Sequence, residues 1–125
     1  MRKTIEDIAA EDGRYNAEAL KFVYEGLGAT IRKIKEAADE DQPRHISGAE
    51  LSKGLAELAI ERWGRLSRMV LNRWGVSTTR DLGEIVYLMI NHKWMTAQET
   101  DTIEDFDNVF DFEEVFEKQF KFNLQ

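Results

Sequence analysis

The chain has 125 residues, of which 42% are hydrophobic and 33% charged, with a formal net charge of -7 and no cysteine. This length fits one domain whose core needs neither disulfides nor a structural metal, and the absence of cysteine excludes thiol nucleophiles and cysteine metal sites. No stretch is apolar enough to span a membrane, and the N-terminus lacks the apolar run of a signal peptide. We therefore expect a single cytoplasmic domain over residues 1–125.

The first elements of the chain favour helix. A single proline and eight glycines in the whole chain favour long helices over a many-stranded sheet. Thr4, followed three residues later by Asp7, predicts the N-cap of a short helix that ends near Gly13. We expect residues 1–14 to be loosely attached. The predicted fold class is all-α, or mostly α, with a single-domain bundle of four to six helices.

The strongest helical pattern extends from about Asn16 to Ala38. Apolar residues recur there at three- and four-residue steps, as Leu20, Val23, Tyr24, Leu27, Ile31, Ile34 and Ala38. Gly26 and Gly28 interrupt the pattern, and each costs about 1 kcal/mol relative to alanine in a helix interior. We expect another helix to cross closely at these glycines, and a bend in the helix is the alternative.

A polar segment, residues 40–45, separates this helix from the next one. Ser47 and Glu50 have the spacing of a capping box, so we predict a helix that begins there and ends at Gly64. A third helix is expected to follow and to end at Gly75. Its predicted buried side consists of Leu66, Met69, Val70 and Trp74.

The next helix is predicted from about Thr79 to His92, with Thr78 as its N-cap and Asp81 three residues later. Its apolar residues have the spacing of one buried face, as Leu82, Ile85, Val86, Met89 and Ile90. Because this helix is the most apolar one in the chain, we expect it to lie at the centre of the bundle.

The last part of the chain differs in composition. We predict a polar linker over residues 95–104 and an acidic segment over residues 105–125, which holds six of the seven phenylalanines. Exposing so many aromatic side chains would create a larger apolar patch than monomers tolerate, so we predict that the segment packs over its own helices. A second chain in a homodimer and a separate protein are the alternatives. The predicted docking residues are Phe106, Phe110, Phe112, Phe116 and Phe120.

Charge is divided unevenly along the chain. Residues 44–93 carry 8 basic and 5 acidic side chains, whereas residues 94–125 carry 2 and 9. The basic part concentrates arginine beside tryptophan, and guanidinium groups suit bidentate and stacking contacts better than ammonium groups. We therefore predict a binding surface there, with the alternative that these arginines hold Glu113, Glu114 and Glu117 of the same chain. Its residues are Arg62, Trp63, Arg65, Arg68, Arg73 and Trp74.

These patterns favour a non-enzymatic binding or regulatory module that associates with itself or with an unidentified protein, and not with a membrane. The runner-up is a nucleic-acid-binding regulator whose basic middle is shielded by the acidic tail, although the helix after Gly75 is too apolar to read bases. An enzyme with no recognisable site is the third alternative. Neither His45 nor His92 lies in a catalytic pattern, and the acids of residues 101–111 do not match a calcium loop. We predict no catalytic residue, cofactor or metal site.

Three stretches, residues 47–64, 74–90 and 104–116, together resemble a small conserved bacterial family described as restricted to Planctomycetes and Verrucomicrobia. The resemblance extends from about Tyr15 to Phe116. It implies a single bacterial cytoplasmic domain. Because that family is uncharacterised, the resemblance implies no activity, cofactor or catalytic residue.

Overall fold

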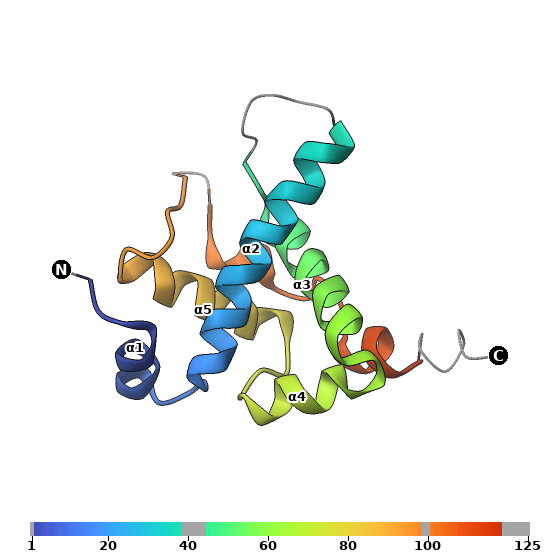
Figure 1. Ribbon diagram of the computed structural model, residues 1–125, viewed down its shortest axis with the longest axis horizontal. Coiled ribbons are helices and arrows are strands. Elements are labelled where there is room, and N and C mark those ends of the chain that lie inside the picture. Colours follow the sequence, from blue (N-terminus) through green and yellow to red (C-terminus); the bar gives the residue numbers. More distant parts are fainter. Residues whose placement is uncertain (1, 39–44, 99–100, 119–125) are drawn as a thin grey trace.

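The computed structural model describes residues 2–38, 45–98 and 101–118 (Figure 1). Within those residues the chain forms an all-α single-domain bundle without strands, which confirms the predicted fold class. The α-helices are α1 (Ile5–Asp12), α2 (Ala17–Ala38), α3 (Gly48–Trp63), α4 (Ser67–Arg73) and α5 (Thr79–Asn91). Three short elements accompany them: the 3-10 helices η1 (Gly64–Leu66) and η2 (Ile103–Phe106), and the π-helix η3 (Glu114–Lys118). None of the described helices is both long and apolar enough to cross a membrane.

Local capping groups set where three of the helices begin, as predicted. The Thr4 hydroxyl accepts a backbone N–H in the first turn of α1. Ser47 and Glu50 form both hydrogen bonds of a capping box at the start of α3, and Thr78 and Asp81 do the same at the start of α5. Each of these contacts spans a few residues of sequence, which is why the sequence alone predicts them.

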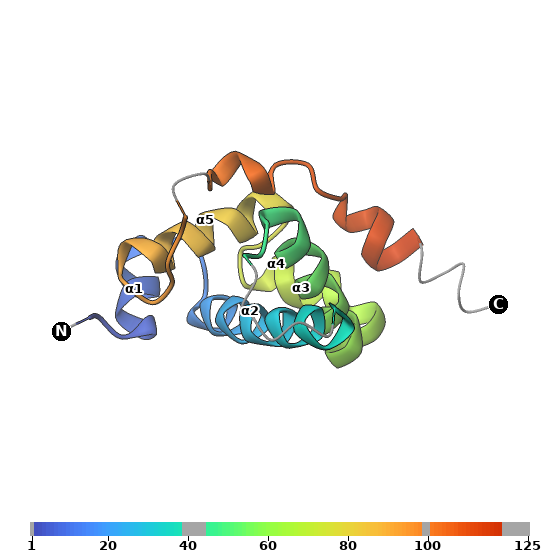
Figure 2. The same ribbon diagram turned by 90° about the horizontal axis from the view of Figure 1, so that it is seen from above.

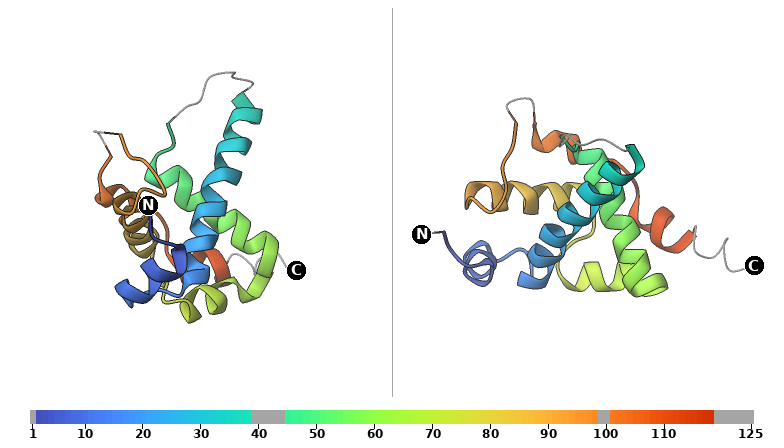
Figure 3. Two further views of the ribbon diagram at one scale, coloured as in Figure 1. Left: turned by 60° about the vertical axis from the view of Figure 1, so that its left-hand side comes forward. Right: turned by 45° about the horizontal axis from the view of Figure 1, so that its top comes forward.

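Helices α2 and α3 cross at close range because small residues meet there (Figure 3). A Cβ atom added to Gly26 would lie 2.1 Å from Cδ2 of Leu55, and one added to Gly54 would lie 2.1 Å from Oγ1 of Thr30. The predicted close crossing is thus confirmed at Gly26. No other helix approaches Gly28, because the atom nearest to an added Cβ is Nη1 of Arg32 on the same helix, at 4.0 Å.

Helix α3 occupies the centre of the bundle. It packs against α2, α4, α5, η2 and η3, whereas α5 packs against α2, α3 and η2. We expected α5 to be central, and its Ile85 and Met89 are indeed fully buried. Position depends on neighbours as well as on apolarity, however. Helix α3 lets several elements approach because it buries small residues, among them Gly48, Ser52 and Ala59.

The first helix is held in place by packing. It buries Ile5 and Ile8 and lies against α2. The indole N–H of Trp94 donates to the carbonyl of Lys3 over 2.8 Å. We expected residues 1–14 to be loosely attached, but these contacts join the segment to two distant parts of the chain.

Helix α4 turns a different side inward from the one predicted. Its buried residues are Ser67 and Leu71, whereas Leu66 and Met69, which we expected to be buried, are 56% and 53% exposed. The Ser67 hydroxyl donates to the carbonyl of Ala59 over 2.9 Å. Apolarity alone favoured the side with Leu66 and Met69, whereas the buried side is held by the hydroxyl of Ser67 and by Leu71, four residues later.

The C-terminal segment, residues 103–118, covers the face of the bundle opposite α2 (Figure 2). Phe106, Phe112 and Phe116 are buried in the core shared with the other helices. Phe110 is half-buried and packs against the rings of the last two. These contacts confirm the predicted packing of the segment over its own chain. Phe120, the remaining predicted docking residue, lies outside the described residues.

Phe106 anchors this segment between α3 and α5. A Cβ atom added to Gly48 would lie 3.0 Å from the Phe106 ring, and one added to Gly83 would lie 2.7 Å from it. The buried Thr79 hydroxyl donates to the carbonyl of Phe106 over 2.6 Å and accepts the N–H of Val109 over 3.2 Å. The contact therefore needs two glycines and one hydroxyl on the facing helices.

The predicted polar linker over residues 95–104 is partly wrong. Met95 is buried at its start, and η2 begins at Ile103, before the linker was expected to end. Thr102 and Asp105 cap η2 with a capping box. Their spacing is a local signal, and the sequence analysis overlooked it.

Candidate functional site

The structure divides the predicted arginine-rich surface into two parts. Arg65, Arg68 and Arg73 lie on η1 and α4, beside the exposed Leu66 and Met69. We call these five residues the α4 face. Leu66, Met69 and Arg73 follow one another at steps of three and four residues, so their side chains lie along the same side of the chain. The α4 face therefore consists of two apolar groups with cationic groups around them.

Two arginines of the region are neutralised within the chain. Arg62 pairs with Glu25 of α2. Nη1 of Arg68 lies 3.0 Å from Oε2 of Glu117, which is one of the tail glutamates that we considered as partners. Both pairs are partly exposed to solvent, so each contributes at most about 1 kcal/mol to stability.

Arg65 and Arg73 have no such partner. Both side chains are exposed, and among the described residues no carboxylate lies within ion-pair distance of either guanidinium. Of the other tail glutamates, Glu114 pairs with Lys118 at 3.7 Å, and Glu113 is exposed. The α4 face thus keeps uncompensated positive charge in a chain whose net charge is -7.

Trp63 and Trp74 belong to the edge of the core. Their ring centroids are 5.2 Å apart in an edge-to-face contact, and they lie 5.1 and 6.1 Å from the ring of Phe22. The sequence suggested cation–π contacts on these tryptophans, but Arg62 lies over Phe22 instead, at 6.0 Å. The aromatic cluster joins the ends of α3 and α4 to α2.

A separate network of charges surrounds the start of α5, and the sequence analysis did not predict it. Arg14 pairs with Asp12 at 3.0 Å and with Glu84 at 3.1 Å. Arg80 pairs with Glu84 and with Asp107, both at 3.0 Å. Hydrogen bonds to Asp12 and Glu84 raise the pKa of the Arg14 guanidinium above its usual value. Because each charge has an opposite partner, we interpret this network as structural.

Asp81 connects the start of α5 to the segment after α1. It accepts the hydroxyl of Tyr15 over 2.7 Å and the backbone N–H of Ser77 over 2.9 Å. Burial by itself would raise the pKa of Asp81, but these hydrogen bonds, together with one from Thr78, lower it below its usual value. Burial and the bond to Asp81 raise the pKa of the Tyr15 phenol. The carboxylate is therefore used by the fold and is not offered to a ligand.

An apolar hollow lies between α2, the start of α3 and the end of α5. We call it the α2–α5 cleft, and its volume is about 520 Å³. Tyr24 and Ile31 of α2 line it and are 42% and 40% exposed. Together with Leu66 and Met69, they are the large hydrophobic side chains that stay exposed in the described part of the chain. Further apolar lining comes from Leu27, Ile46, Tyr87, Ile90 and Trp94.

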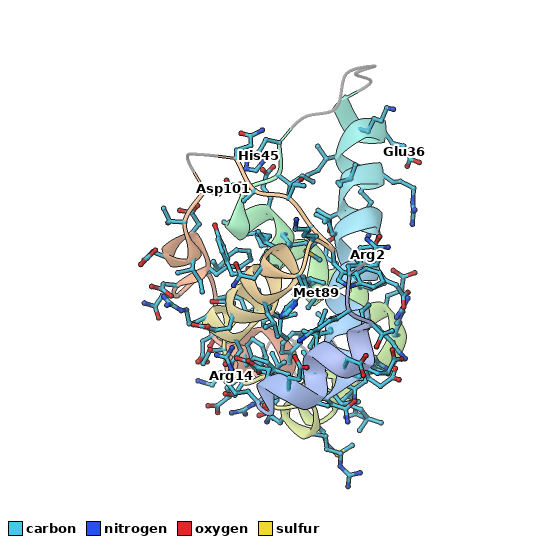
Figure 4. All side chains as sticks on the ribbon, turned by 90° about the vertical axis from the view of Figure 1, so that its left-hand side faces the viewer. Arg2, Arg14, Glu36, His45, Met89 and Asp101 are labelled. Carbon is cyan, nitrogen blue, oxygen red and sulfur yellow. The ribbon has the colours of Figure 1, made fainter. Side chains whose placement is uncertain are left out.

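His45, Asp101 and Lys93 also line the cleft. Nε2 of His45 and Oδ1 of Asp101 are 2.6 Å apart, although the two residues come from different segments (Figure 4). The second carboxylate oxygen of Asp101 accepts the N–H of Gln98 over 2.8 Å. Lys93 is exposed and has no ion-pair partner among the described residues. Its ammonium is thus the charged group of this lining that the chain leaves uncompensated.

The two ends of the cleft differ in charge. At one end the guanidinium of Arg2 lies 3.7 Å from the centroid of the Trp94 ring, and this ring meets Tyr24 edge to face at 5.6 Å. At the other end lies Tyr87. Burial, followed by the negative charge of Asp101 and of nearby acids, raises the pKa of this phenol. Positive charge therefore gathers near Trp94 and negative charge near Tyr87.

The cleft has almost no signature in the sequence. His45 was weighed as a single residue, because its partner Asp101 lies 56 positions away and no motif links them. Gly28, in the middle of a helix, was the one local signal, and it lines the cleft. Among the described residues, no group of three or more histidine, aspartate or glutamate side chains is placed to hold a metal ion.

No protein-family model, curated protein or solved structure matches the chain. The functional argument therefore rests on two surfaces of the molecule itself, the α4 face and the α2–α5 cleft.

Proposed function

We propose that the protein is a non-enzymatic binding module whose α4 face binds an acidic, amphipathic helix of another protein. The observation that carries the proposal is the exposure of Leu66 and Met69 beside Arg65 and Arg73, which have no ion-pair partner among the described residues. A cytoplasmic location is part of the proposal and rests on the absence of cysteine. Bacterial origin likewise stays a prediction from the family resemblance.

The apolar part of this surface supplies affinity. Fully burying a leucine or methionine side chain contributes on the order of 1.5–3 kcal/mol. Leu66 and Met69 are more than half exposed in the isolated chain, so a partner that covers them gains part of this energy. Such a pair at helical spacing fits the apolar stripe of an amphipathic helix.

The cationic part of the surface supplies selectivity. Arg65 and Arg73 border the apolar pair, and a guanidinium binds a carboxylate through two parallel hydrogen bonds. Glutamate or aspartate beside the partner's apolar stripe therefore complements the α4 face. Arg68 contributes less, because Glu117 of the same chain already pairs with it.

Charge also separates this partner from the alternatives. A symmetric homodimer through the α4 face would bring two copies of the same arginine-rich surface together, and like charges repel. Nucleic acid would make use of the arginines, but Arg62 and Arg68 are already neutralised and the exposed Leu66 would gain nothing from phosphate. We therefore favour a different protein of acidic character.

The test measures binding of a labelled synthetic peptide by fluorescence anisotropy. The peptide is helical and carries leucines at three- and four-residue steps with glutamates beside them. Its counterpart has lysine in place of each glutamate, and a DNA duplex is titrated at the same ionic strength. We expect the acidic peptide to bind, and Arg73→Glu to weaken it by about tenfold or more, which corresponds to ~1.4 kcal/mol. Arg32→Glu on α2 makes the same charge change elsewhere and is the matched control.

Glu117→Gln adds a change in the opposite direction. It releases Arg68 from its partner, so the acidic peptide is expected to bind more tightly to this variant. Deleting residues 101–125 is the wrong way to expose the basic region, because it would remove Phe106 and Phe116 from the core. A single charge change at the surface leaves the fold intact.

Three outcomes would overturn the proposal. The first is equal binding of the acidic and the basic peptide, since charge would then play no part. The second is tighter binding of DNA with a steep dependence on salt, which would favour the nucleic-acid alternative. The third is a concentration-dependent dimer, seen by analytical ultracentrifugation, that Met69→Asp dissociates, because a second copy would then occupy the α4 face.

A further inference from the structure

We infer that the α2–α5 cleft is a binding site for a small monocarboxylic acid with an apolar tail, and that Lys93 pairs with the carboxylate. The site is separate from the α4 face and does not depend on the function proposed for that face. It uses a different pair of exposed hydrophobic residues, Tyr24 and Ile31.

The size and lining of the cleft fit a small apolar molecule. Its volume of about 520 Å³ lies within the range of roughly 300–1,000 Å³ that ligand pockets span. Aromatic rings from two helices and from the turn after α5 face this space, as Tyr24, Tyr87 and Trp94. Aliphatic side chains, among them Leu27, Ile31 and Ile90, form another part of the wall, which suits a hydrocarbon or aryl tail.

Gly28 lines the cleft, and no close packing explains this glycine in the middle of α2. Glycine in a helix interior costs about 1 kcal/mol relative to alanine, and at Gly26 the close approach of Leu55 explains why glycine is needed. No such neighbour exists at Gly28, where an added Cβ would have its nearest atom at 4.0 Å. Gly28 therefore lines the cleft without serving packing between helices.

Lys93 holds a backbone conformation that would suit glycine better. It follows the last turn of α5 with φ 67°, in the left-handed region. Its N–H donates to the carbonyl of Ile90 and the N–H of Trp94 donates to that of Met89, the two bonds of a helix end that glycine usually makes. A lysine in this position costs backbone energy. What it adds to the lining of the cleft is an ammonium group.

The charges around the cleft specify a single negative group on the ligand. One carboxylate oxygen of Asp101 contacts His45, and the other accepts the N–H of Gln98. Because Asp101 is engaged in this way, the ammonium of Lys93 can bind an anion of the ligand. Arg2, stacked on Trp94, adds positive charge in the same region. The acids near Tyr87 disfavour a second negative charge toward the other end. A monocarboxylate with its apolar tail directed along the aromatic wall satisfies both conditions.

The experiment compares three probes with a ten-carbon chain that differ in the charge of the head group: decanoate, 1-decanol and decyltrimethylammonium. The two ionic probes are titrated below their micelle concentrations and 1-decanol below its solubility limit. Each is added to isotopically labelled full-length protein, and amide chemical shifts report both affinity and location. We expect decanoate to bind most tightly and to shift amides of Ile31, Ile90 and Trp94. Amides of α4 should stay unchanged.

Two substitutions separate the proposed role of each residue from its effect on folding. Lys93→Gly relieves the left-handed backbone, so its thermal midpoint should equal or exceed that of the wild type, while its affinity for decanoate falls to that of 1-decanol. Gly28→Leu adds an apolar side chain to the lining of the cleft and should weaken binding of all three probes. Lys53→Gln, on the exposed side of α3, removes the same charge outside the cleft and is the control.

The inference is wrong if 1-decanol or decyltrimethylammonium binds as tightly as decanoate. It is also wrong if Lys93→Gly, still folded, binds decanoate as the wild type does, or if the shifted amides lie outside the cleft. Failure here is independent of the peptide test, because Arg73→Glu should leave decanoate binding unchanged.

Discussion

Helix α4 and the C-terminal segment of residues 103–118 look alike in the sequence and differ in the fold. Both carry large apolar side chains at helical spacing among charged ones. The C-terminal segment buries its aromatic rings, with Phe116 1% exposed, whereas α4 leaves Leu66 56% exposed. The difference arises because Gly48 and Gly83 on the facing helices leave room for the ring of Phe106. Helix α4 instead packs against the core through Ser67 and Leu71, on its other side. Apolar residues that the fold does not use are the better candidates for contact with a partner.

The largest effect is expected when the removal of a buried ring is compared with the removal of an exposed side chain, in two separate variants. Phe116→Ala should lower the free energy of unfolding by about 3–5 kcal/mol, because it removes a fully buried aromatic group and leaves a cavity. Met69→Ala should change it by less than about 0.5 kcal/mol. Urea titrations followed by circular dichroism measure both values. Similar losses for the two variants would mean that α4 is part of the core.

The next test adds a methyl group to α5 where this helix packs against the C-terminal segment. Gly83→Ala places a methyl group 2.7 Å from Phe106 and should cost about 1–3 kcal/mol through overpacking. Gly28→Ala on α2 meets only an ordinary contact with Arg32 at 4.0 Å and should stabilise the protein by up to about 1 kcal/mol. The two glycine substitutions are therefore expected to shift the urea midpoint in opposite directions. A shift of the same sign would contradict the packing described for these two sites.

A third test removes the hydroxyl that holds this segment. Thr79→Val keeps the side-chain volume but leaves the Phe106 carbonyl and the Val109 N–H without their partner. The expected loss is about 1–3 kcal/mol. Ser77→Ala, at an exposed site before the same helix, is a milder control because Asp81 keeps its other hydrogen bonds. Amide hydrogen exchange of residues 103–110 should rise in the Thr79 variant and stay near wild type in the control.

A fourth test uses pH at the start of α5, on which the C-terminal segment rests. The pKa of Asp81 is lower in the folded chain than its ordinary value of 3.8. Its contribution to stability is therefore present above that value and is lost as the pH falls through the lower folded pKa. The thermal midpoint should drop between about pH 5 and pH 2, and Asp81→Asn should reduce this drop. An unchanged profile in the variant would show that other carboxylates govern the acid response.

The smallest expected effect concerns the contact that joins the two regions directly. Arg68 and Glu117 lie 3.0 Å apart, and their side chains are 34% and 42% exposed. Glu117→Gln should therefore lower the free energy of unfolding by less than about 1 kcal/mol, and the difference should shrink further in high salt. A loss as large as that of Phe116→Ala would mean that the ion pair, and not the aromatic rings, holds the segment.

Part of the fold could be predicted because it depends on short-range signals. Thr4, the capping boxes at Ser47 and Thr78, and the stop at Gly64 each act over a few residues, so their patterns are complete in the sequence. The burial of the phenylalanines could be predicted from their number, because so many aromatic side chains, Phe106 among them, cannot all stay exposed to solvent. Predicting the buried side of α4 failed because that side carries a serine, Ser67, whose burial depends on a hydrogen bond to Ala59 of another helix.

The two candidate sites were harder to predict from the sequence than the helices were. Clustering of arginine pointed to the region of the α4 face, but which guanidinium meets a carboxylate depends on where Glu25 and Glu117 arrive in space. The one local sign of the α2–α5 cleft in the sequence is Gly28, a glycine in the middle of a helix. Its other parts, such as His45 and Asp101, come from segments separated by most of the helices of the bundle.

The sequence by itself therefore determined the helices, their caps and the need to bury a phenylalanine-rich tail, because these follow from hydrogen bonds between near neighbours and from total apolar content. Only the tertiary structure decided which apolar side chains remain outside and which charges remain uncompensated. Both depend on distances between residues far apart in the chain, such as those from Gly83 to Phe106 and from Arg68 to Glu117, and these distances exist only once the helices are packed.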